Sequence, residues 1–80
     1  MEKTVNLKYP IKLDGTEVKS LKFRRAKGGD IIAARKMSGG DDLTMAFHMI
    51  ANLGGITFED VCELDAGDLK TVQEEIGDFF

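Results

Sequence analysis

The chain has 80 residues, of which 42% are apolar and 31% charged, and its formal net charge is −3. A chain of this length fits one small domain, residues 1–80, with a modest core and little room for a deep catalytic cleft. No apolar run is long enough to span a membrane, and no apolar stretch typical of a signal peptide follows Lys3. The single cysteine excludes an internal disulfide, so we expect a cytoplasmic protein.

The charge divides unevenly along the chain. Residues 1–27 contain eight Lys or Arg and three acidic residues, a balance of +5, whereas residues 28–80 contain three and eleven, a balance of −8. A basic first third could bind nucleic acid or an acidic partner. The simpler interpretation is that the two halves attract each other, within one fold or between copies, and that lysines protect the hairpin edges from pairing with other chains.

Residues 4–25 are predicted to form a β-hairpin. The apolar side chains of its first strand occupy alternate positions: Val5, Leu7, Tyr9, Ile11 and Leu13. This alternation is typical of a strand that buries one face. Asp14-Gly15 then predicts a two-residue turn, because both central residues of such a turn need a positive φ.

The second strand of the hairpin is expected to contain a bulge. Val18 is at an even position whereas Leu21 and Phe23 are at odd positions, so the apolar pattern changes parity. A one-residue bulge near residues 19–20 would restore it, beside Pro10, which has no N–H to donate to a strand ladder. The resulting register pairs Leu13 with Thr16, Ile11 with Val18, Tyr9 with Leu21, and Leu7 with Phe23.

Residues 30–80 are predicted to be helical. Asp30 can cap a short helix from Ile31 to about Met37, which the glycines after Ser38 end. A second helix begins after Asp41 or Asp42 and continues to about Leu53. Its apolar residues cover most of its circumference: Leu43, Ala46, Phe47, Met49, Ile50, Ala51 and Leu53. Only Thr44, His48 and Asn52 form a polar stripe. A helix of this kind is buried by its own domain or by a partner.

We interpret residues 54–69, GGITFEDVCELDAGDL, as a segment whose glycines and acidic residues end and cap short helices. Thr57 and Asp60 resemble a capping box for a helix from Phe58 to about Glu63, whose apolar face would hold Phe58, Val61 and Cys62. Asp65 caps the last helix, and Asp68 is favourably placed near its positive end. The last helix has a narrow apolar stripe made of Leu69, Val72, Ile76, Phe79 and Phe80.

No pattern in the sequence indicates a catalytic, metal-binding or phosphate-binding site. The acidic residues do not match a calcium-binding loop, and one cysteine with one histidine cannot build a structural zinc site. Cys62 and His48 could form a nucleophilic dyad in principle, but Cys62 falls on an apolar face and His48 on a polar stripe. No phosphate-binding loop is present. We therefore predict no enzyme activity, no metal and no cofactor.

A nucleic-acid-binding regulator is the alternative function. Residues 43–63 have the outline of a helix-turn-helix, but its second helix would carry three acidic residues and would be repelled by phosphates. The basic hairpin, with Tyr9 and Phe23, is the better candidate for such an activity. Nucleic acid is nevertheless the less favoured partner.

The order of motifs resembles the small tail assembly chaperones of long-tailed, mainly contractile-tailed, bacteriophages and prophages. The resemblance covers nearly the whole chain and rests on four segments: PIKLDGTEVKSLKFR, GGDIIAARK, GGDDLTMAFHMIANLGGI and LDAGDLKTVQEEIGDFF. It implies a non-catalytic role, in which the protein coats an aggregation-prone tape measure protein and recruits tail tube subunits. The implied place of action is the cytoplasm of the bacterial host.

The sequence thus predicts an α+β fold, with a hairpin at residues 4–25 and three to four short helices packed as a small bundle at residues 30–80. Partner binding is expected to use apolar side chains that extend beyond the core stripes. Met45, at the edge of the apolar arc, is the first candidate, followed by Met49, and Phe79 or Phe80 could join them. The wide apolar arc and the opposite charges of the two halves also predict self-association.

Overall fold

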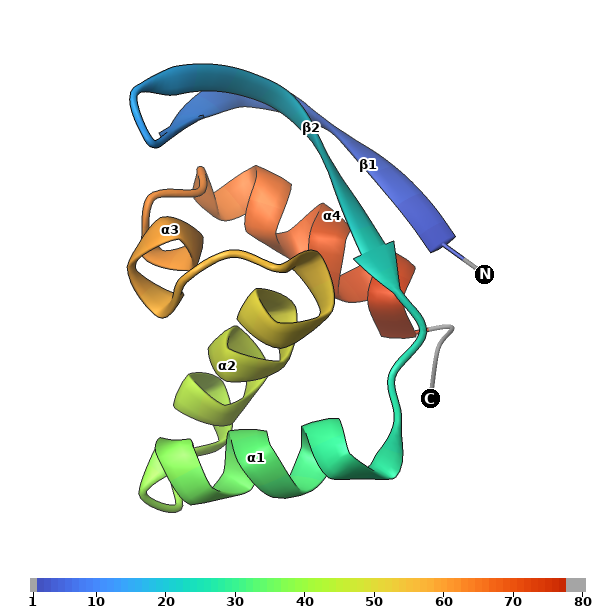
Figure 1. Ribbon diagram of the computed structural model, residues 1–80. Coiled ribbons are helices and arrows are strands. Elements are labelled where there is room, and N and C mark those ends of the chain that lie inside the picture. Colours follow the sequence, from blue (N-terminus) through green and yellow to red (C-terminus); the bar gives the residue numbers. More distant parts are fainter. Residues whose placement is uncertain (1, 78–80) are drawn as a thin grey trace.

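The computed structural model describes residues 2–77 and contains a two-stranded antiparallel hairpin followed by four helices (Figure 1). The elements are β1 (Glu2–Leu13), β2 (Thr16–Arg24), α1 (Gly28–Ser38), α2 (Asp42–Gly54), α3 (Phe58–Cys62) and α4 (Ala66–Gly77). This order confirms the predicted α+β class and the division into a hairpin and a helical part.

The hairpin turn forms as its sequence predicts. Asp14 and Gly15 have φ values of 51° and 79°, so both central residues adopt the left-handed conformation that the two-residue turn requires. Leu13 is opposite Thr16 and Ile11 is opposite Val18, which confirms the register next to the turn.

The predicted position of the bulge is wrong. The irregularity lies in β1, between Asn6 and Ile11, and not in β2 near residues 19–20. Beyond it, Asn6 is opposite Ser20 and Val5 is opposite Leu21, so the pairs predicted for Tyr9 and Leu7 do not form. Leu7 is still buried, whereas Tyr9 leaves the apolar face and is 62% exposed.

Asp68 on α4 is the physical reason for the bulge in β1. Its carboxylate accepts hydrogen bonds from the backbone N–H groups of Lys8 and Tyr9, at 3.1 and 3.0 Å. Asp68 itself is 3% exposed, and its two partly buried hydrogen bonds connect the hairpin to the last helix. Pro10 follows directly and has no N–H to donate. The backbone N–H groups of Lys8 and Tyr9 therefore donate to Asp68 on α4 and not to β2.

The helix ends follow local capping rules, and one predicted helix start, that of α1, is corrected. Asp41 caps α2 by accepting from the N–H of Thr44, and Thr57 and Asp60 form the expected capping box of α3. Gly39 and Gly55 end α1 and α2 in the left-handed conformation. Asp30, however, lies inside the first turn of α1, where its carboxylate accepts from the N–H of Lys27. The helix thus begins earlier than predicted.

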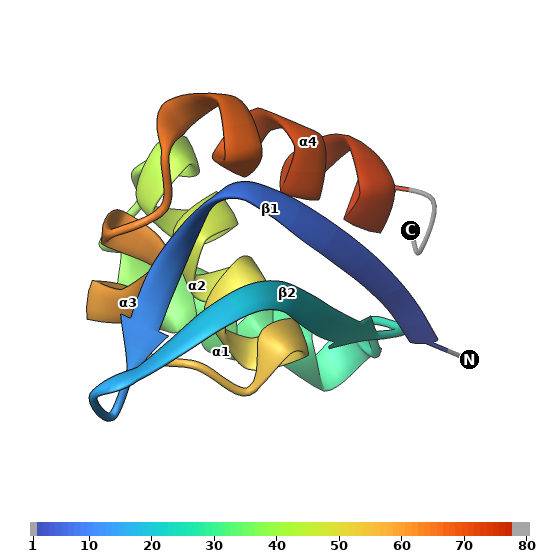
Figure 2. The ribbon, with the colours of Figure 1, turned by 90° about the horizontal axis from the view of Figure 1, so that it is seen from above.

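The core lies between the hairpin and the helices. Viewed from above, β1 runs between α4 and β2, and the helices lie beneath the sheet (Figure 2). The four largest of the fully buried side chains come one from the hairpin and one each from α2, α3 and α4: Phe23, Ile50, Val61 and Val72. α1 packs mainly against α2, at the side of the molecule farthest from the hairpin (Figure 1).

Candidate partner-binding site

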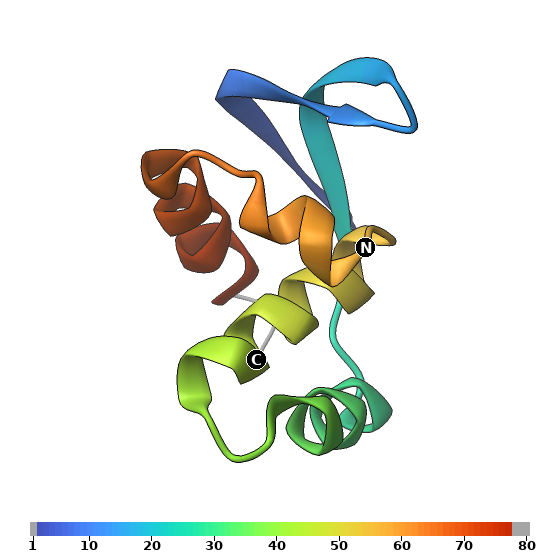
Figure 3. The same ribbon diagram turned by 90° about the vertical axis from the view of Figure 1, so that its left-hand side faces the viewer.

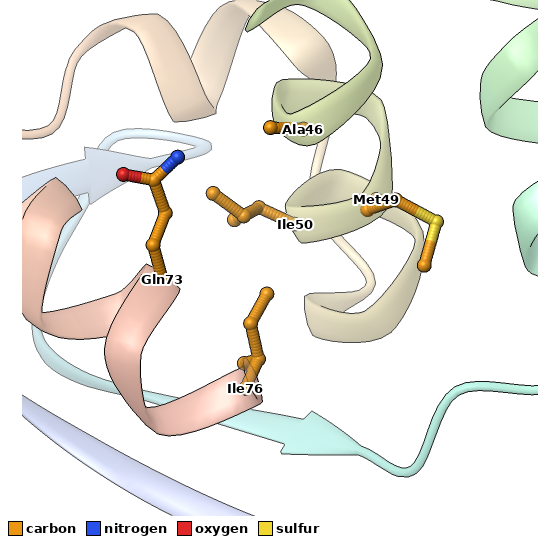
Figure 4. Close-up of a pocket in the computed structure, with 5 residues that line it drawn as sticks. All are labelled: Ala46, Met49, Ile50, Gln73 and Ile76. Atoms are coloured by element: carbon orange, nitrogen blue, oxygen red, sulfur yellow. The ribbon is translucent and has the colours of Figure 1, made fainter. Parts of the chain in front are cut away.

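An apolar pocket opens between α2 and α4. It has a volume of about 180 Å³ and is lined by Ala46, Met49, Ile50, Gln73 and Ile76. Ile50 projects from α2 towards Gln73 and Ile76 on α4 (Figure 4). The Gln73 amide is the single polar side chain of the wall. Such a pocket suits one large apolar side chain of a partner, with a single hydrogen bond to orient it.

The structure brings one predicted binding residue to this pocket. Met49 is 5% exposed and lines it, so this side chain serves both the core and the wall. Met45, one turn earlier on α2, is partly buried and packs against the core. Phe79 and Phe80 lie outside the described residues. The assignment of these four residues to partner binding stays a prediction.

Sequence reasoning did not identify Gln73 or Ala46 as wall residues. Ala46 was assigned to the apolar arc of α2, and Ile76 to the stripe of α4. Gln73 is three residues before Ile76 and therefore shares its side of the helix. The available signal was this spacing, but nothing local indicates that α4 turns this side towards α2.

The predicted position of Cys62 is wrong. Its side chain is exposed, because Val61 is the residue of α3 that enters the core. His48 is half-buried, and its ring stacks on that of Phe58 with centroids 4.5 Å apart. Among residues 2–77, no group of three or more His, Cys, Asp or Glu side chains could hold a metal ion.

The basic hairpin offers one exposed aromatic ring. Phe23, the second aromatic residue considered for nucleic-acid stacking, is fully buried, whereas Tyr9 is exposed. Sequence-tolerant binding of single strands usually uses several stacked rings. The hairpin surface therefore gives little support to the regulator alternative.

Two ion pairs between described residues connect the hairpin to the helices. The two terminal guanidinium nitrogens of Arg24, Nη1 and Nη2, donate to the Asp30 carboxylate on α1, at 2.8 and 2.6 Å. These hydrogen bonds, together with the N–H of Lys27, lower the pKa of Asp30 from 3.8 to about 2. The ammonium of Lys3 lies 3.5 Å from a carboxylate oxygen of Glu75 on α4.

Comparison with known families decides the class of the protein. The model of the family described as phage tail assembly chaperone proteins, E, or 41 or 14, matches residues 4–80. The chain belongs to this family. The predicted family, the tail assembly role and the absence of enzyme activity are thereby confirmed. No curated protein and no solved structure gives a match.

Family membership implies tail proteins as the partners of this chaperone and the infected host cell as its place of action. No helix within residues 2–77 has both the length and the apolar character needed to cross a membrane.

Proposed function

We propose that this chaperone binds an apolar helical segment of the tape measure protein and keeps that protein soluble until tail tube subunits replace the chaperone. The proposed place of action is the cytoplasm of the bacterial host. The pocket between α2 and α4 carries this proposal, because its wall is apolar except for the Gln73 amide. One large side chain of an amphipathic helix would fill it, as in other proteins that bind a helix in a groove.

Met49 and Met45 supply an adaptable border for such a helix. A methionine side chain has three rotatable bonds and a polarisable sulfur, so it repacks against different apolar partners. The long tape measure protein would present many related segments, which favours an adaptable site over a rigid one. Phe79 and Phe80 follow α4 in the sequence and are proposed to extend the apolar surface.

The proposal is tested by co-expression with the tape measure protein of the same phage. The variants are Met45→Asp, Phe80→Asp and Gln73→Glu, which place a charge next to the apolar surface or in the pocket wall. Ile32→Asp is the matched control, because Ile32 is an exposed apolar residue on α1. Soluble tape measure protein should fall with the three variants and stay unchanged with the control.

Circular dichroism of each purified variant shows whether its fold is intact. The proposal is wrong if the wild-type chaperone neither solubilises the tape measure protein nor co-purifies with it. The assignment of the binding surface is wrong if the three variants and the control behave alike.

Self-association is proposed as part of the same function. The helical half has a charge balance of −8 and the basic first third one of +5, so opposite surfaces of two copies attract each other. Sedimentation of the purified chaperone from micromolar to millimolar concentration should show a mass that increases with concentration. A constant monomer mass over this range would contradict self-association.

A further inference from the structure

A second apolar surface lies where α2 meets α3, away from the pocket. We refer to it as the α2–α3 ledge, and it comprises Leu43, Phe47, His48 and Phe58. The ring centroids of Phe47 and Phe58 are 5.9 Å apart, and those of His48 and Phe58 are 4.5 Å apart. Figure 3 views the molecule from the side on which α3 lies in front of α2.

The other residues of the range 2–77 cover the ledge only partly. Phe47 packs against the core, but Phe58 rests on Phe47 and His48 and remains half-buried. Leu43, one helical turn before Phe47, is 62% exposed. A row of rings that ends in an exposed leucine has the composition of a protein-binding surface, in which aromatic residues are enriched.

The chain segment that contains the ledge carries charges of a single sign. Residues 37–69 contain no Lys or Arg but seven acidic residues: Asp41, Asp42, Glu59, Asp60, Glu63, Asp65 and Asp68. Asp42, Glu59 and Glu63 are exposed, and within residues 2–77 none of the three forms an ion pair. Unpaired acidic side chains beside an apolar surface attract a cationic partner and repel a polyanion.

We infer that the α2–α3 ledge binds a basic amphipathic helix of a partner protein. Apolar side chains of that helix would pack on Leu43 and the Phe58 ring, while its Lys or Arg residues would face Asp42, Glu59 and Glu63. This inference rests on the proposed function and adds to it, because it selects basic segments of the tape measure protein. The pocket between α2 and α4 selects by apolar shape and by the Gln73 amide, without a charged group.

The first test uses two synthetic peptides of about 18 residues, a length at which an isolated helix can form. One contains Leu and Lys in an amphipathic arrangement, and the other has Glu in place of each Lys. The wild-type chaperone should bind the Lys peptide at least about tenfold more tightly than the Glu peptide, and raising the salt concentration should reduce the difference. Equal binding of the two peptides would overturn the inference.

Matched variants locate the site on the chaperone. Leu43→Ser should weaken binding of the Lys peptide about fivefold or more, whereas Ile32→Ser, at a residue that is 60% exposed on α1, should change it less than about twofold. Glu59→Lys should likewise weaken binding, whereas Glu74→Lys, on the exposed side of α4, should have little effect. Equal effects of a ledge variant and its control would mean that the peptide binds elsewhere, and the inference would fail.

Co-purification with the tape measure protein separates this inference from the proposed function. Loss of co-purification in Leu43→Ser and Glu59→Lys, with normal behaviour of both controls, supports the ledge. Normal co-purification of both ledge variants overturns the inference and leaves the proposed function intact, provided that Met45→Asp abolishes it. If Leu43→Ser instead lowers the sedimentation mass of the chaperone alone, the ledge is an interface between copies, and the inference is wrong.

Discussion

Replacing Asp68 with alanine should destabilise the fold more than removing any other single acidic side chain among residues 2–77. The Asp68 carboxylate is 3% exposed and forms no ion pair with the described residues. The N–H groups of Lys8 and Tyr9 are its hydrogen-bond donors. The alanine variant leaves both donors without a protein acceptor and also removes a negative charge from the first turn of α4.

The structure sets the size of the effect. A hydrogen bond to a charged group contributes about 1.5–3 kcal/mol to stability, so two such bonds give an upper limit of about 6 kcal/mol. The bonds to Lys8 and Tyr9 are only partly buried, and water can replace part of what is lost. We expect Asp68→Ala to lower the free energy of unfolding by about 2–4 kcal/mol, a large fraction of the stability of a small domain. Asp68→Asn keeps one acceptor oxygen but sets its NH2 group against the second backbone N–H, so it should lose most of the same stability.

Denaturant unfolding and amide hydrogen exchange together check this reasoning. The matched control is Asp65→Ala, because Asp65 is exposed and accepts one hydrogen bond, from the N–H of Gly67. This control should cost about 1 kcal/mol as a lost cap. Exchange of the Lys8 and Tyr9 amides should accelerate in Asp68→Ala more than that of the remaining β1 amides. Equal unfolding midpoints for the two variants, with both amides still protected, would show that Asp68 does not hold the bulge.

Three further substitutions test other contacts. Gly54→Ala should destabilise the protein by about 1–3 kcal/mol in denaturant unfolding, because its Cβ would lie 2.8 Å from a ring carbon of the fully buried Phe23; an unchanged midpoint would contradict this. The Asp30 pKa is lowered to about 2, so the Arg24 ion pair stabilises fully above about pH 4 and is lost as the pH falls through 2. Asp30→Asn should cost about 1 kcal/mol at neutral pH, less near pH 2, and nothing well below pH 2. Cys62→Ala should change the free energy of unfolding by less than about 0.5 kcal/mol, and Cys62 should react quickly with a thiol reagent in the native protein.

The parts of the fold that were predicted correctly have local causes. The Asp14-Gly15 turn needs two residues that tolerate positive φ, and that requirement is met within the turn itself. The box formed by Thr57 and Asp60 and the glycine that ends α2 likewise act within a few residues. Neighbouring residues determine such signals, so the sequence reveals them before the tertiary structure is known.

The errors arise where a distant residue decides the outcome. The parity change between Val18 and Leu21 correctly indicated a bulge, but it cannot say which strand contains the extra residues. Asp68, about sixty positions away in the sequence, favours a bulge in β1 because it accepts hydrogen bonds from the N–H groups of Lys8 and Tyr9. On α3, helical spacing allowed either side of Val61 to face the core, and packing against α2 left Cys62 outside.

The same distinction explains how much of the binding surface was predictable. The apolar arc of α2 can be read from its sequence, and Met49 within it does line the pocket. The other wall depends on which side α4 turns towards α2, and the hydrogen bonds from β1 to Asp68 help to hold this orientation. Since Asp68 and Gln73 are on the same helix, loosening these hydrogen bonds should also move the Gln73 wall of the pocket. Asp68→Ala is therefore expected to weaken tape measure binding even at temperatures where the variant remains folded.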